Sequence, residues 1–248
     1  MASERYTLPD IIRGSALIQM MLYHGLWDLV FVFGIDIPWF GSAGCYIWQQ
    51  SICWVFIFLS GFCVNFSKHK LKRAVTVLIC SAVISIVTIV VMPYAAVKFG
   101  VLTLIGSGML FMIPLDKLFS KVPPLAGGAV SMLLFILTRN VPYGYLGFEN
   151  LNIISLPQSL YCNIFTAYIG FPPADFSSSD YFSVVPWFFL FSAGYFAYRI
   201  FRKYDLFQIL SPVTIPPIEW LGRHSLVIYM IHQPLIYGIL LLTAWAAG

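Results

Sequence analysis

Four ionisable side chains lie at helical spacing in the apolar stretch DIIRGSALIQMMLYHGLWD, residues 10–28. Arg13 and His24 are eleven residues apart, which at ~100° per residue is about 20° past three full turns, so both point the same way. Asp28 lies one turn after His24, and Asp10 lies one turn before Arg13. Ionisable side chains at membrane depth are costly and are commonly functional, so this stripe is expected to face a protein interior.

The imidazole of His24 is the leading catalytic candidate, because near neutral pH it can act as general base, nucleophile or proton carrier. Asp28 could orient the ring and stabilise its cationic form, as the third member of a catalytic triad does. The structural alternative is that His24 only hydrogen-bonds a neighbouring helix.

Three cationic side chains form a candidate anion site. Arg13 lies about 16 Å along the helix from His24, and its planar guanidinium suits a phosphate. Arg223 and His224, in IEWLGRHSLVIYMIHQPLIY, could complete that site. The alternatives are that these side chains reach for lipid headgroups or that Arg13 pairs with Asp10.

Four further residues are candidates for substrate binding. His232 and Gln233 lie about two turns beyond His224, although they could equally satisfy carbonyls freed by Pro234. Asp180 and Trp187 mark the outer entry of another apolar segment. Trp187 could stack on a sugar ring, but a tryptophan at the membrane interface is the commoner explanation.

The composition indicates the element that must position these residues, a membrane-spanning helix. Of 248 residues, 60% are hydrophobic and only 10% are charged, and the mean hydropathy is +0.85. Soluble domains carry about 25% charged residues, so an integral membrane protein is expected. The apolar runs are long and continuous, which favours an all-α, polytopic helical bundle over a barrel.

We expect a single transmembrane domain over residues 1–248. Seven spans are predicted, at about 10–34, 44–66, 73–93, 99–119, 123–139, 182–201 and 219–245.

The basic residues predict the orientation of these spans. With a cytoplasmic N-terminus, only Lys98 and Arg139 of the fourteen Lys and Arg residues fall outside, which leaves twelve inside and places the C-terminus outside. The net charge of +4 therefore reflects the orientation of the chain in a cell membrane, and no nucleic-acid partner is expected. Residues 140–157 are expected to form an outer loop, and residues 158–170 a re-entrant or interfacial helix. The five cysteines show no metal-ligand spacing and no disulfide framework, so no metal is expected.

Four segments in order resemble the heparan-α-glucosaminide N-acetyltransferase catalytic-domain family, within the integral-membrane acyltransferases. They are DIIRGSALIQMMLYH (10–24), FGVLTLIGSGML (99–110), DYFSVVPWFFLFSAGY (180–195) and LGRHSLVIYMIHQP (221–234). Arg13 and His24, with ten residues between them, also match a signature of membrane acyltransferases that O-acetylate cell-surface glycans. The resemblance implies acetyl transfer from cytosolic acetyl-CoA to an amino sugar or other glycan on the far side of the membrane.

The chain departs from that family at two positions. Lysosomal members carry Asn where His24 falls and place a proposed catalytic His in the following loop, whereas residues 29–47 here contain no His. Thr103 stands where many relatives have a His. Two alternative hypotheses for the function remain. One is a proton-coupled transporter that uses His24 and Asp28 as a relay, and the other is a purely structural membrane protein. Self-association into a homo-oligomer is left open.

Overall fold

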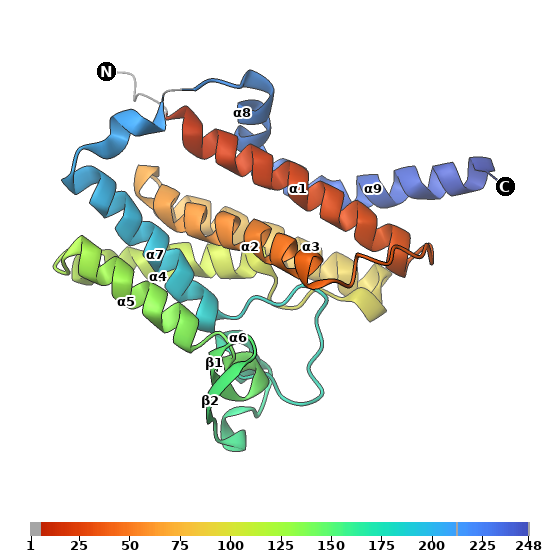
Figure 1. Cartoon of the computed structure of the whole chain (residues 1–248), viewed down its shortest axis with the longest axis horizontal. Coiled ribbons are helices and arrows are strands. Elements are labelled where there is room, and N and C mark those ends of the chain that lie inside the picture. The colour runs from red at the N-terminus through yellow and green to blue at the C-terminus, as the bar shows by residue number, and fades with distance from the viewer. Residues whose placement is uncertain (1–5, 212, 248) are drawn as a thin grey trace. The chain divides into compact units, whose positions relative to one another are not determined.

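The computed structural model describes residues 6–211 and 213–247, and over these residues it forms nine α-helices and one small sheet (Figure 1). The helices are α1 (Thr7–Phe31), α2 (Ala43–Cys63), α3 (Lys70–Val91), α4 (Val101–Phe119), α5 (Pro124–Leu137), α6 (Ile164–Ile169), α7 (Val184–Lys203), α8 (Pro216–Arg223) and α9 (Ser225–Ala247). The strands are β1 (Tyr145–Phe148) and β2 (Leu151–Ser155), which pair antiparallel. The chain is an all-α membrane protein apart from this hairpin.

Six of the seven predicted spans contain one α-helix each, and the seventh, over 219–245, contains α8 and α9. An apolar run in a membrane can satisfy its backbone groups within the same segment only as a helix. Within the described residues, five of these helices are long and apolar enough to cross a membrane: α2, α3, α4, α7 and α9. α5 is apolar but has only 14 residues. α1 has 25 residues, but its polar side chains interrupt the apolar run.

The chain divides into two compact units, which are described separately. Unit 1 contains residues 1–56 and 205–248, and unit 2 contains residues 57–204. The boundary falls within α2. That the whole chain acts as one transmembrane domain stays a prediction.

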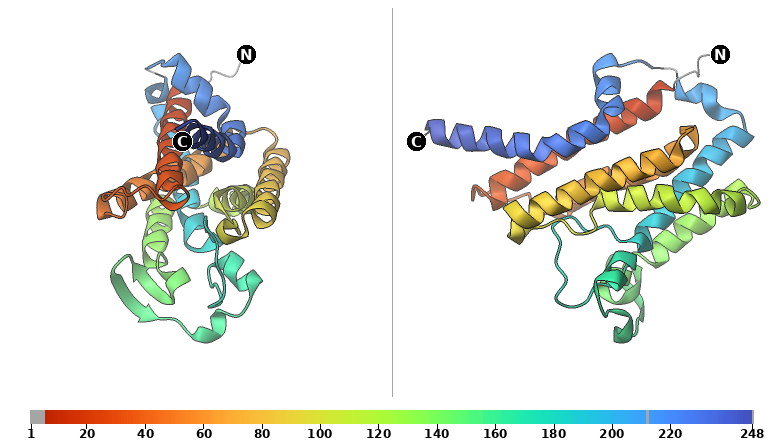
Figure 2. Two further views of the ribbon diagram at one scale, coloured as in Figure 1. Left: turned by 90° about the vertical axis from the view of Figure 1, so that its right-hand side faces the viewer. Right: turned by 180° about the vertical axis from the view of Figure 1, so that it is seen from behind.

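In unit 1, α1 packs against both α8 and α9 (Figures 1 and 2). Leu17 and Met20 of α1 and Ile52 of α2 are its buried centre, and Leu221 of α8 and Ile228 of α9 pack against them. The side chains that face this centre from α1 recur at three- and four-residue intervals, as the helical period requires.

The predicted continuous span over 219–245 is wrong, because the helix breaks at His224. α8 ends at Arg223, where the backbone N–H of His224 donates to the carbonyls of both Trp220 and Leu221. α9 then starts at Ser225. The break separates Glu219 and Arg223, on α8, from His232 and Gln233, on α9.

In unit 2, α5 packs along α7, and α3 packs along α4 (Figures 1 and 2). The segment predicted as an outer loop, 140–157, contains a β-hairpin formed by β1 and β2, and its location outside the membrane stays a prediction. The buried Asn140 side chain donates to the carbonyls of Glu149 and Leu151 and to the Asn152 side chain, which ties both strands to the end of α5. Arg139 pairs with Glu149 at the turn.

The predicted re-entrant or interfacial helix over 158–170 is much shorter than expected. The structure has a 3-10 turn at Gln158–Leu160 and then α6, which spans only six residues, or about 9 Å. Asn163 and Thr166 form a capping box at its start. α6 is too short to cross half a bilayer, and its location at the membrane interface stays a prediction.

Candidate functional site

Helix α1 carries the two residues with the most specific spacing. It is continuous from Thr7 to Phe31, so the predicted helical relation of Arg13 and His24 is confirmed, with about 16 Å of rise between them. Each meets a different part of the C-terminal region. Arg13 lies at α8 and His24 lies at α9.

His24 contacts His232 of α9. Their ring centroids are 5.0 Å apart and the ring planes are inclined by 60°. His232 is only 6% exposed, and its Nδ1 lies 2.6 Å from the carbonyl oxygen of Tyr229. A carbonyl oxygen can only accept, so Nδ1 carries the proton and Nε2 carries a lone pair. That Nε2 is buried without a hydrogen-bond partner among the described residues.

Asp28, one turn beyond His24, is almost fully buried at 1% exposure. Its Oδ1 accepts a hydrogen bond of 2.7 Å from Nε2 of Gln233, so the hydrogen bond that Asp28 makes is with Gln233 rather than with the His24 ring. The other oxygen of each side chain, Oδ2 of Asp28 and Oε1 of Gln233, is buried and has no partner in the described part of the chain.

These four residues, His24, Asp28, His232 and Gln233, are called the α1–α9 polar cluster below. Three of its buried acceptor atoms have no donor in the part of the chain that the structure describes: Oδ2 of Asp28, Oε1 of Gln233 and Nε2 of His232. Buried polar atoms are nearly always paired, and leaving one unpaired costs about 1–3 kcal/mol. The cluster is therefore suited to a ligand that donates hydrogen bonds, and its imidazoles can take up a proton.

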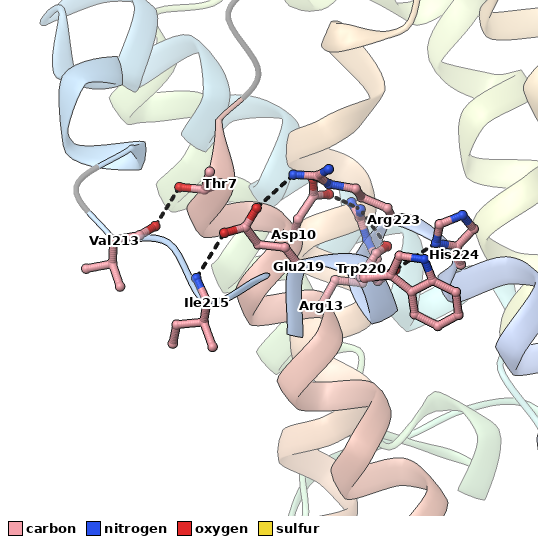
Figure 3. A network of polar contacts seen from close by, with 10 residues as sticks. Thr7, Asp10, Arg13, Val213, Ile215, Glu219, Trp220, Arg223 and His224 are labelled. Atoms are coloured by element: carbon pink, nitrogen blue, oxygen red, sulfur yellow. Dashed lines mark hydrogen bonds and ion pairs between the residues drawn. The ribbon is translucent and has the colours of Figure 1, made fainter. Parts of the chain in front are cut away.

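A second group of polar side chains joins the start of α1 to α8 (Figure 3). Asp10 lies 3.2 Å from Nη1 of Arg13 and 3.6 Å from Nε of Arg223. Arg223 also pairs with Glu219 at 2.7 Å, and the second oxygen of Glu219 accepts the Ile215 backbone N–H. Asp10, Arg13, Glu219 and Arg223 are called the α1–α8 ion-pair network. Its two cations are matched by two carboxylates.

Close backbone contact explains why α8 meets α1 at this point. A Cβ atom on Gly14 would overlap the carbonyl oxygen of Ile218, and one on Gly222 would overlap the carbonyl oxygen of Asp10. The two glycines thus allow the helix backbones to touch, which brings Arg223 over Asp10. Arg13 also reaches the carbonyl of Gly222, at 3.5 Å.

The predicted anion site is brought together only in part. Arg13 and Arg223 meet at Asp10, and the side chain of Arg223 remains 41% exposed. His224 is exposed; its Nδ1 donates to the Trp220 carbonyl and its ring lies on the Trp220 ring at 4.5 Å (Figure 3). Any anion must therefore compete with Asp10 and Glu219 for the two guanidinium groups.

The two predicted outer residues, both in unit 2, have structural partners. Asp180 accepts the Val101 backbone N–H at 3.2 Å, at the first residue of α4. Burial raises the pKa of Asp180 to about 6, although this hydrogen bond opposes the shift. Trp187 is 4% exposed, with Phe182 and Phe135 against its ring and the Arg139 guanidinium 4.7 Å from the ring centre. A sugar could reach the Trp187 ring only if these neighbours moved.

Sequence reasoning missed two features of the site. The Tyr229 carbonyl, which fixes the tautomer of His232, lies three residues before it and leaves no signal in residue type. Gly14 and Gly222 were not identified either. Small residues at helix contacts are the signal that could have found them.

One comparison with known proteins matches this chain. The family model described as "Heparan-alpha-glucosaminide N-acetyltransferase, catalytic" covers residues 5–234, and this range includes every residue of both clusters. No curated protein and no solved structure matches. The match extends over most of the 248 residues, so the chain belongs to the heparan-alpha-glucosaminide N-acetyltransferase catalytic family.

Proposed function

We propose that this protein moves an acetyl group from cytosolic acetyl-CoA to an acceptor on the outer side of a cell membrane, an amino sugar or another glycan. The observation that carries the proposal is the set of three buried acceptors of the α1–α9 polar cluster that have no partner among the described residues, one of them on the His232 ring that contacts His24. A primary amine supplies several N–H donors from one atom, which suits Oδ2 of Asp28 and Oε1 of Gln233. The family name points to the same class of acceptor.

His24 is the proposed base. It takes a proton from the acceptor's amine or hydroxyl as that group attacks the thioester carbonyl, and the departing CoA sulfur leaves with the electron pair of the C–S bond. In the covalent variant His24 itself accepts the acetyl group first and then passes it on. In both variants the acetyl group ends on the acceptor and the thiol of CoA is regenerated with the released proton.

The phosphates of CoA are proposed to bind near Arg13, Arg223 and His224. The side chain of Arg223 is 41% exposed and is therefore more accessible than that of Arg13, at 14%. The thin pantetheine arm would then follow α1 for the ~16 Å that separates Arg13 from His24. This arrangement requires the α1–α8 junction to lie on the cytoplasmic side, as the distribution of Lys and Arg predicts.

The proposed location is the plasma membrane, with a cytoplasmic N-terminus and an outer C-terminus. The partners are then acyl-CoA, the lipid bilayer and the glycan acceptor. A reporter fused to the C-terminus should read as external. A cytoplasmic reading would mean that the chain crosses the membrane an even number of times.

Labelled acetyl transfer tests the proposal directly. The purified protein in proteoliposomes is given [¹⁴C]acetyl-CoA on one side and glucosamine on the other, and the acetylated sugar is separated and counted. Transfer that requires the protein is the expected result. No transfer to glucosamine or to other glycan acceptors, together with proton-driven uptake of a solute, would favour the transporter in which His24 and Asp28 act as a relay.

A further inference from the structure

A histidine that acts as a base needs a second group to hold its ring and to accept its other N–H once it becomes cationic. From the sequence, Asp28 was the expected partner of His24. In the structure Oδ1 of Asp28 accepts a hydrogen bond from Gln233, and Oδ2 makes no hydrogen bond with His24 or with any other described residue. The partner of His24 must therefore be sought elsewhere in unit 1.

His232 has the required features. Its Nδ1–H donates to the Tyr229 carbonyl, so the ring cannot turn over without losing that bond, and Nε2 is held as an acceptor. Nε2 is buried and unpartnered among the described residues, while the ring lies 5.0 Å from the His24 ring, centroid to centroid. A lone pair fixed in this position is suited to the N–H of a neighbouring imidazole.

We propose that His232, through Nε2, is the positioning residue of His24: it accepts the His24 N–H and stabilises the ring as His24 becomes cationic. This inference rests on the proposed function. During transfer one nitrogen of His24 takes the acceptor's proton, the new C–N or C–O bond forms, and the C–S bond of the thioester breaks. The other nitrogen of His24 keeps its proton and donates it in a hydrogen bond to His232. The proton gained by His24 then passes to the CoA thiolate.

The other titratable side chains around the two rings, within the described residues, are few. They are Tyr23 and Asp28 on α1 and Tyr229 on α9. Tyr23 meets His24 edge-on at 6.0 Å, and Tyr229 lies 5.3 Å from His232, both measured between ring centroids. Asp28 is the sole acid among these described side chains, and its Oδ1 accepts a hydrogen bond from Gln233.

Two substitutions of His232 separate positioning from folding. In His232→Asn the side-chain amide can still donate to the Tyr229 carbonyl, but the acceptor at the Nε2 position is lost. In His232→Gln the longer side chain places an amide oxygen near the Nε2 position, so an acceptor for His24 is kept. Acetyl transfer is expected to fall roughly 10²-fold or more in His232→Asn and substantially less in His232→Gln.

The matched control is His69→Asn, because His69 is exposed at the start of α3 and far from the cluster in the sequence. Its activity should equal that of the unsubstituted protein. Equal losses in His232→Asn and His232→Gln would overturn the proposal, since a merely structural role predicts no rescue by the longer amide.

A second measurement does not depend on activity. The chain has four histidines, so ¹⁵N-histidine NMR of the protein in nanodiscs can be assigned by single substitutions. His232 is expected as the Nδ1–H tautomer, and the ring signals of His24 should shift in His232→Asn but not in His69→Asn. An Nε2–H tautomer, or unchanged His24 signals, would contradict the pairing. If the unsubstituted protein transfers no acetyl group, the proposed function fails while this spectrum still decides the pairing.

Discussion

Helix α1 contributes to two polar clusters that differ in how completely their atoms are paired. In the α1–α8 ion-pair network two arginines meet two carboxylates, and over the described residues every buried side-chain polar atom of the network has a partner. In the α1–α9 polar cluster three buried acceptors lack a donor within residues 6–211 and 213–247. Both lie in unit 1, and both join α1 to the C-terminal region.

The difference separates a structural role from a binding role. A complete set of ion pairs holds two helices together, but a ligand must displace a partner to bind there. Buried acceptors without donors lower the stability of the protein. They are retained where a bound ligand supplies the missing donors. We infer that the α1–α8 network fixes the geometry of α1 and that the α1–α9 cluster receives the acceptor.

Removal of His24 should have the largest effect on activity. A positioned base contributes about 10²–10⁴-fold, so His24→Ala is expected to abolish measurable acetyl transfer while acetyl-CoA affinity stays within a few-fold. Transfer assays and isothermal titration on the same preparation measure both quantities. Full activity in His24→Ala would remove His24 from the mechanism and leave His232 as the candidate base.

Removal of Asp10 should have the largest effect on stability. Asp10→Ala takes a carboxylate from both Arg13 and Arg223, at a site where Asp10 itself is 5% exposed. A cost of about 3 kcal/mol in the free energy of unfolding is expected. Chemical unfolding in detergent measures it. A variant as stable as the unsubstituted protein would show that the network does not hold α8 on α1.

The two arginines test whether the paired network also binds CoA. If it does, Arg13→Ala or Arg223→Ala should weaken acetyl-CoA binding by about 1.5–3 kcal/mol, the scale of a charge-assisted hydrogen bond. Arg13→Lys should recover only part, because an ammonium lacks the fork of the guanidinium. Unchanged affinity by isothermal titration in both alanine variants would confine the network to its structural role.

Asp28→Asn should move stability and activity in opposite directions. The new side-chain amide can donate to Oε1 of Gln233 while its oxygen still accepts from Nε2, so an unpartnered acceptor is satisfied and a buried acid is removed. We expect the free energy of unfolding to rise by about 1 kcal/mol and the rate of acetyl transfer to fall clearly. A lower free energy of unfolding in this variant would contradict this expectation, because it would mean that the carboxylate of Asp28 makes a stabilising interaction that the amide cannot make.

Asp180, a carboxyl group in unit 2, gives the smallest and most local effect. Its pKa in the folded protein is raised from 3.8 to about 6, so the folded state holds the proton more tightly than the unfolded state. Its favourable contribution is therefore present below about pH 4 and is lost as pH rises through about 6. Asp180→Asn keeps an acceptor for the Val101 N–H and should remove this pH dependence.

Thermal unfolding of both proteins at about pH 5 and about pH 7.5 measures the effect of Asp180→Asn. The unsubstituted protein should lose more stability over that interval than the variant. Identical losses would show that Asp180 does not titrate there.

The helices were predictable because their signal is local. Continuous apolar runs identify α2, α3, α4, α7 and α9, and the eleven-residue separation of Arg13 and His24 fixes their common face once a helix is assumed. The same periodicity could not reveal the break at His224. That break depends on α8 lying against α1 through Gly222, and the two segments are about two hundred residues apart in the chain.

The site was predictable in its residue types and not in its pairings. His24, Asp28, His232 and Gln233 were all identified, but Asp28 was assigned to His24, its neighbour in the helix. In the structure its hydrogen-bond partner is Gln233, 205 residues away. Likewise, the hairpin at 145–155 depends on the buried amide of Asn140, and a loop-like composition gave no sign of it.

A structure determined with acetyl-CoA and glucosamine present would test the comparison between the two clusters most directly. We expect the sugar's amine within hydrogen-bond distance of Oδ2 of Asp28 and Oε1 of Gln233, with the thioester beside His24 and the α1–α8 ion pairs intact. Ligand density elsewhere, with those acceptors still unpartnered, would contradict it.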